Sequence, residues 1–139
     1  MVCCKTLADV GASEGDLASQ AESIALHTRR LASELAELAE LAKLAELAEL
    51  AELAAPHAAV ASAVARIPGV AEGALSALRP GGRCIDALSA LAELDTECSA
   101  AIAQMSDLPR PPVYRVLNEV DGLKLHAGRS LYYVSCLYH

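Results

Sequence analysis

The sequence has no phenylalanine and no tryptophan, and its four tyrosines all lie in the last quarter of its 139 residues. Alanine and leucine together make up more than a third of the chain. Both residues favour helices, and a core built from them lacks the large rings that usually dominate buried surfaces. The composition therefore favours closely packed helices over a broad pocket, and the length suits one domain with a buried core.

Basic side chains are also scarce. The chain has 11 Lys and Arg residues against 18 Asp and Glu residues, which gives a formal net charge of −7. An acidic surface repels phosphate backbones, so the charge argues against a general role in nucleic-acid binding. A local basic patch remains compatible with this balance.

Residues 64–83 provide the alternative hypothesis of a phosphate- or nucleic-acid-binding module. The run Ile67-Pro68-Gly69-Val70 resembles the turn of a helix-hairpin-helix, a motif that binds DNA phosphates through backbone amides. Ala71 stands where such hairpins usually have a second glycine. A loop of arginines and glycines then precedes a predicted helix, whose N-terminus favours anions. The candidate anion-binding residues are Arg66, Arg79 and Arg83.

Long apolar runs are missing as well. The longest uncharged stretch in the body of the chain, Leu53–Ala65, is shorter than the ~20 residues that a membrane span needs. The first ten residues lack the apolar run of a secretory signal. We therefore expect no transmembrane segment and a cytoplasmic location.

The five cysteines are odd in number and contain no CxxC motif, so a disulfide framework is not expected. Cys84 and Cys98 would lie roughly 21 Å apart along one helix, too far for a bridge. Acylation of Cys3 and Cys4, which would make the protein membrane-peripheral, is another hypothesis. No catalytic or metal-site motif is present, so we expect no enzyme activity, no metal and no cofactor.

One long helix is predicted from Ser13 to Ala55. Ser13 can cap its first turn, Asp16 lies three residues later, and no proline occurs before Pro56. Such a helix would be roughly 63 Å long.

The first half of this helix has the spacing of a coiled-coil seam. Apolar residues alternate by four and three positions between Leu17 and Leu38, which we call the heptad seam. The seam could bind another chain, or it could pack on a second long helix of this chain at 85–106. The predicted interaction residues are Leu17, Ile24, Leu31, Leu35 and Leu38.

The second half repeats Leu-Ala-Glu from Leu35 to Ala54. A three-residue step advances about 300° around a helix, so the row of leucines drifts by roughly 60° per repeat. The face of the seam consequently changes to Ala42 and Ala45 and then to Glu49. We therefore expect this half to contact different neighbours at different heights, or to leave leucines exposed at one end.

After Pro56 the pattern predicts short helices at 58–67 and 70–78, a Pro68-Gly69 turn, and the long helix at 85–106. The C-terminal quarter is ambiguous between a helix and strands, and we favour a short helix followed by extended structure.

The sequence thus predicts a mainly α fold, a helical bundle or hairpin. Its expected organisation is a flexible lead at 1–12, a helical domain at 13–108, a Pro-rich linker at 109–112 and a small C-terminal unit at 113–139. The leading functional hypothesis is a non-catalytic helical module for protein interaction or self-association through the heptad seam. Low complexity and inconsistent helix phases also fit a chain with no refined function.

Overall fold

The computed structural model describes residues 6–7, 14–108 and 111–138. The helices are α1 (Glu14–Leu47), α2 (Ala51–Val64), α3 (Ile67–Leu78), α4 (Cys84–Met105) and α5 (Pro111–Tyr138). Within these ranges there is no strand, only an isolated bridge between Thr6 and Arg83. The prediction of a mainly α helical bundle is confirmed.

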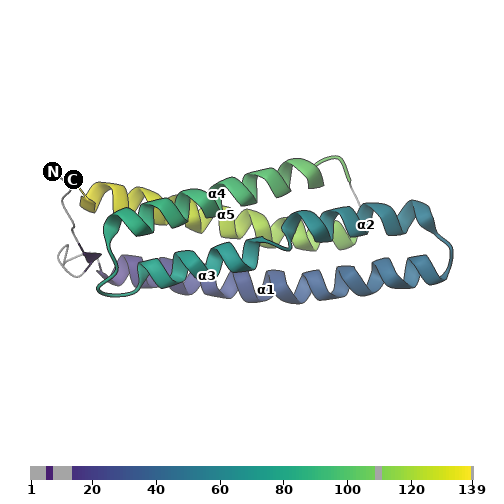
Figure 1. Ribbon diagram of the computed structural model, residues 1–139, viewed down its shortest axis with the longest axis horizontal. Coiled ribbons are helices and arrows are strands. Elements are labelled where there is room, and N and C mark those ends of the chain that lie inside the picture. Colours follow the sequence, from purple (N-terminus) through teal and green to yellow (C-terminus); the bar gives the residue numbers. More distant parts are fainter. Residues whose placement is uncertain (1–5, 8–13, 109–110, 139) are drawn as a thin grey trace.

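The helices form an antiparallel four-helix bundle in which α2 and α3 together make one member. As Figure 1 shows, α1 runs one way, α2 and α3 return beside it, α4 runs forward again, and α5 returns. Helix α5 packs along both α1 and α4, and α3 also packs along both. Short connections make consecutive helices neighbours, so α1 and α4 lie diagonally opposite. The predicted packing of the first helix on 85–106 is therefore wrong, because α5 lies beside α1.

The long helix predicted at 13–55 is interrupted by a turn at residues 48–50. The amide of Leu50 donates to the carbonyl of Ala45 at 2.8 Å, and that of Glu49 donates to Glu46 at 3.0 Å. This pattern is a Schellman motif, with Glu49 in the left-handed conformation (φ 59°) that glycine usually adopts. The reversal allows Ala42 and Ala45 to be buried, whereas a straight helix would carry the glutamates onto the same face.

The prediction that the long helix ends before Pro56 is wrong, because Pro56 lies inside α2. It is the sixth residue of α2, so its missing N–H removes one helical hydrogen bond close to the helix start. The predicted turn at Pro68-Gly69 is also wrong, because both residues lie in the first turn of α3, where proline is well tolerated. The actual break is at residues 65–66, and α2 and α3 continue in the same direction rather than forming a hairpin (Figure 1).

By length and composition, the stretch Ala51–Leu78 could cross a bilayer, the one helical stretch among the described residues for which this holds. Core helices of globular proteins meet the same criterion. Here α2 packs on α1 and α4, and α3 does the same.

The C-terminal quarter is one 28-residue helix, so the predicted extended structure is wrong. Helix α5 continues through Gly122 and through the tyrosine-rich end. Its buried residues recur every three or four positions, which outweighs the strand preference of tyrosine and valine. These buried residues are Val113, Val116, Val120, Leu123, Ala127, Ser130 and Val134.

The turn at residue 49 gives a direct test of the backbone. We expect Glu49→Gly to raise the free energy of unfolding by about 1 kcal/mol, because glycine adopts positive φ without a steric penalty. Glu40→Gly, an exposed change inside α1, should lower it by about 1 kcal/mol. Urea unfolding of both variants measures the two changes in the free energy of unfolding, which should have opposite signs. Destabilisation by Glu49→Gly would contradict the turn geometry.

Candidate functional site

The heptad seam lies in the core of the bundle. Leu17, Ile24, Leu31 and Leu38 are buried, and Leu35 is partly buried against the same cluster. Residues of α2, α3, α4 and α5 complete that cluster. The seam therefore packs within the chain.

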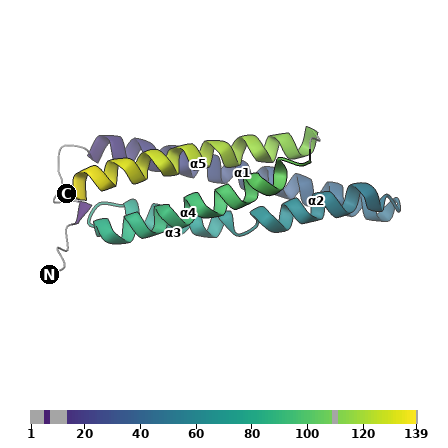
Figure 2. The same ribbon diagram turned by 90° about the horizontal axis from the view of Figure 1, so that it is seen from above.

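Five exposed leucines lie instead at the end of the α1–α2 hairpin. Figures 1 and 2 show this hairpin extending past the ends of α4 and α5, and we call residues 40–55 the overhang. Ala42, Ala45 and Ala54 are buried between its two helices. The leucines of the repeat remain outside, as the drift of the repeat predicted. Their exposed fractions are 40% at Leu41, 59% at Leu44, 81% at Leu47, 50% at Leu50 and 38% at Leu53.

The overhang is acidic as well as apolar. Four glutamates and one lysine of this segment are exposed. The repeat therefore surrounds the leucines with negative charge. The charged residues are Glu40, Lys43, Glu46, Glu49 and Glu52.

A groove of about 280 Å³ lies at the base of the overhang, where α5 begins beside α1. Its apolar lining comes from Leu38, Leu41 and the two prolines that open α5. Arg115 lies in this groove, with its guanidinium 2.8 Å from Glu37 and 3.7 Å from Glu34. The groove therefore combines an apolar floor with two carboxylates that share one arginine.

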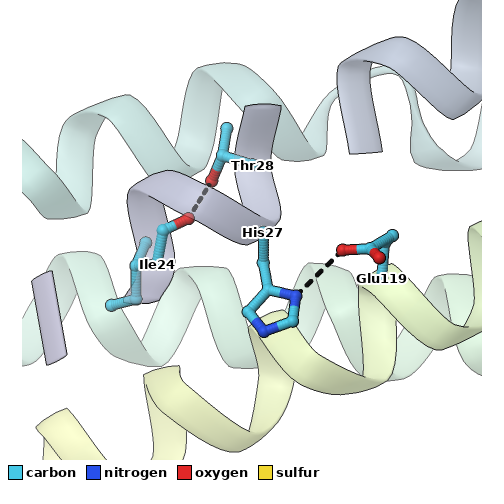
Figure 3. Close-up of polar contacts among 4 residues, drawn as sticks. All are labelled: Ile24, His27, Thr28 and Glu119. Atoms are coloured by element: carbon cyan, nitrogen blue, oxygen red, sulfur yellow. Dashed lines mark hydrogen bonds and ion pairs between the residues drawn. The ribbon is translucent and has the colours of Figure 1, made fainter. Parts of the chain in front are cut away.

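A polar cluster joins α1 to α5 further along the bundle. The Nδ1 atom of His27 lies 2.9 Å from Glu119 Oε2, and Figure 3 shows the imidazole directed from α1 toward that carboxylate. The ring of His126 stacks on that of His27 with centroids 5.3 Å apart, and its Nδ1 lies 2.9 Å from Gln20 Oε1. Thr28, the residue after His27, donates to the carbonyl of Ile24 one turn earlier in α1.

Close helix approach makes this cluster possible. A methyl group on Gly122 of α5 would lie 2.7 Å from Nδ1 of His27, so glycine leaves the space that the imidazole fills. The cluster can orient α5 on α1 and fix their register. Its side chains form two polar pairs, His27 with Glu119 and His126 with Gln20, which the stacked imidazoles join.

Sequence reasoning missed this cluster, although a signal was present. Gln20 and His27 are seven residues apart, and so are Glu119 and His126, which places each pair on one helix face. In antiparallel helices, a step of seven residues forward on one helix lies beside a step of seven residues back on the other. The contact of His27 with Glu119 therefore places Gln20 beside His126. Recognising the match requires knowing that α1 and α5 are neighbours.

The pKa of His126 is held below its ordinary value of 6.5, first by burial and then by the charges of His27 and Arg129. The unfolded chain therefore takes up this proton at a higher pH than the folded chain, so the free energy of unfolding falls as the pH drops below about 6.5. His126→Gln should make this fall shallower. Urea unfolding at about pH 7.5 and 5.5 measures it, and equal pH dependence in both proteins would refute this assignment.

Helix α3 separates Arg66 from Arg79, so the three predicted anion-binding arginines do not gather in one place. Arg66 precedes α3 and Arg79 follows it, so they lie at opposite ends of a helix roughly 18 Å long. Arg66 lies 3.6 Å from Glu97, and Arg83 donates two hydrogen bonds to Asp86. The hydrogen bond from Arg83 holds the pKa of Asp86 below its usual value. These arginines therefore do not form one anion site.

The cysteines do not form a reactive site among the described residues. Cys3 and Cys4 lie outside that part of the chain. Cys84 and Cys98 are buried, and burial raises the pKa of the Cys98 thiol to about 12. Cys136 is a free, exposed thiol. Where the structure describes the chain, no three His, Cys, Asp or Glu side chains gather in a way that could hold a metal ion.

Comparison of the chain with protein-family models, with curated proteins and with solved structures finds no significant match.

Proposed function

We propose that this protein is a non-catalytic helical interaction module whose binding surface is the overhang. The observation that carries the proposal is the set of five exposed leucines on a two-helix extension of a four-helix bundle. Exposed apolar side chains are costly to leave in water, and where several lie in one region of a folded protein they often mark a binding site for another chain. The heptad seam contributes to this function by building the bundle that supports the overhang.

The geometry of the overhang favours a helical partner. Two antiparallel helices pack through small alanines at Ala42, Ala45 and Ala54, and they leave the leucines of both helices exposed. An amphipathic helix can lay its apolar face on such a surface, with leucines of both chains as anchors. The same contact between two copies would be self-association.

An unbiased library of displayed helical peptides tests the proposal. We expect selected peptides to bind the whole protein with micromolar affinity. They should lose at least about tenfold in affinity when the five overhang leucines, 41, 44, 47, 50 and 53, are all replaced by glutamine. Sedimentation at increasing concentration shows whether a second copy takes the same place.

Matched controls come from exposed leucines elsewhere in the chain. Leu26 in α1 and Leu125 in α5 are exposed to 38% and 52%, and both lie outside the overhang. Replacing these two by glutamine should leave peptide affinity within about twofold. If no peptide is enriched, or if both variants bind peptides equally, the overhang is not the binding surface.

A further inference from the structure

The groove at the base of the overhang lies where α5 begins beside α1. Leu41 follows the buried Leu38 by three residues, and Leu53 precedes the buried Val60 by seven, so both belong to core-facing sides of their helices. They are nevertheless 40% and 38% exposed, and Figure 2 shows the α1–α2 hairpin extending past the ends of α4 and α5. Another helix placed beyond the start of α5 would cover them.

The charges around the groove define what such a helix must carry. Glu34 and Glu37 line the groove, and an adjoining hollow adds Glu40 beside Leu41. Among the described residues, Arg115 is the one basic residue lining either space, and it already lies within 4 Å of both Glu34 and Glu37. Three carboxylates against one guanidinium leave the groove negative, which favours a partner with lysine or arginine next to its apolar face.

We infer that this groove binds an amphipathic, basic helix of a partner protein, which takes the place that α5 leaves open beside α1. The inference rests on the proposed function and names the partner's chemistry. Leucine of the partner helix would cover Leu41, while its basic residues would face Glu34, Glu37 and Glu40. The overhang of a second copy of this chain fits less well, because it is acidic. Lys43 is the single exposed basic residue within residues 40–55.

The test uses the full-length protein and a designed peptide. The probe is a fluorescent helical peptide of about 18 residues, with leucines along one face and lysines flanking them. A matched peptide has glutamate in place of every lysine. We expect the lysine peptide to bind at least tenfold more tightly than the glutamate peptide, and to weaken when salt rises from about 0.05 to 0.3 M.

Variants of the groove then locate the binding. Leu41→Gln and Glu37→Gln should each weaken the lysine peptide about five- to tenfold, whereas Leu26→Gln, an equally exposed position outside the overhang, should change affinity less than twofold. Arg115→Met keeps the length of an unbranched apolar stem but removes the guanidinium. The basic residues of the peptide then no longer compete with Arg115 for Glu34 and Glu37, so the substitution should tighten binding at least about threefold. Circular dichroism verifies that each variant is folded.

Three results would overturn the inference. They are equal binding of the two peptides, no loss of affinity in Leu41→Gln and Glu37→Gln, and a stable dimer whose formation those two variants abolish. In the first two cases, peptide binding that still depends on Leu44 and Leu47 would leave the proposed function standing. If even the variant with all five leucines replaced binds peptides normally, the proposed function fails as well.

Discussion

Leu31→Ala is expected to lower the free energy of unfolding by about 2–5 kcal/mol, whereas Leu47→Ala should change it by less than about 0.5 kcal/mol. The two leucines lie on one helix and differ in their surroundings. Leu31 is fully buried among the side chains of the bundle core, and Leu47 is 81% exposed at the overhang. Truncation at Leu31 therefore loses apolar burial and leaves a cavity, while truncation at Leu47 does neither.

Denaturant unfolding at matched protein concentration checks this contrast. A loss of several kcal/mol is large against the roughly 5–15 kcal/mol by which domains are usually stable. If the heptad seam instead bound a second copy, the effect of Leu31→Ala would depend on protein concentration. Equal effects at the two positions would mean that the seam is not the core of the folded monomer.

Gly122→Ala is the second large expected effect, and its sign is the point of interest. Alanine inside a helix is normally more stable than glycine by about 0.5–1 kcal/mol. Here the added methyl group would overlap the imidazole of His27. Displacing that ring breaks its contact with Glu119 and its stacking on His126, so we expect a net loss of about 1–2 kcal/mol.

A double-mutant cycle separates the two contributions. In a His27→Ala background the obstruction is gone, so Gly122→Ala should become stabilising by about 0.5–1 kcal/mol. Gly128→Ala, with open space around its position in the same helix, should stabilise the protein in either background. If Gly122→Ala has the same effect with and without His27, α1 and α5 are not in contact at this point.

The burial of the first half of α1 could be predicted from its sequence because its spacing is regular. Leu17, Ile24, Leu31 and Leu38 lie seven residues apart and are all buried. Spacing along one helix says which face is covered but not by what. The prediction of the covering helix was therefore wrong, since the choice between α4 and α5 depends on the connections from α3 to α4 and from α4 to α5, far along the chain.

Two local features explain the remaining errors. The turn at 48–50 contains neither glycine nor proline, and its left-handed residue is a glutamate within an otherwise helical repeat. The end of α5 is rich in tyrosine, yet Ser130 and Val134 continue the helical spacing of its buried face. In both places tertiary packing decides the conformation against the local preference.

The candidate surface was half predictable. Exposed leucines at one end follow from the three-residue drift of the repeat, so Leu44 and Leu47 could be anticipated from sequence. The groove could not, because it depends on where α5 begins relative to Leu41 and on the position of Arg115.

The free end of the α1–α2 hairpin also makes the protein tolerant of changes in length. Its two legs are anchored in the bundle at Leu38 and Val60, so residues added between these points extend the hairpin outward and leave the anchors in register. Two extra Leu-Ala-Glu units would add three residues to each leg, lengthening it by roughly 4.5 Å and turning the leucines at its tip by roughly 60°. The three residues of a single Leu-Ala-Glu unit cannot be divided equally between the two legs. The fold therefore accommodates insertion or deletion of two units at a time.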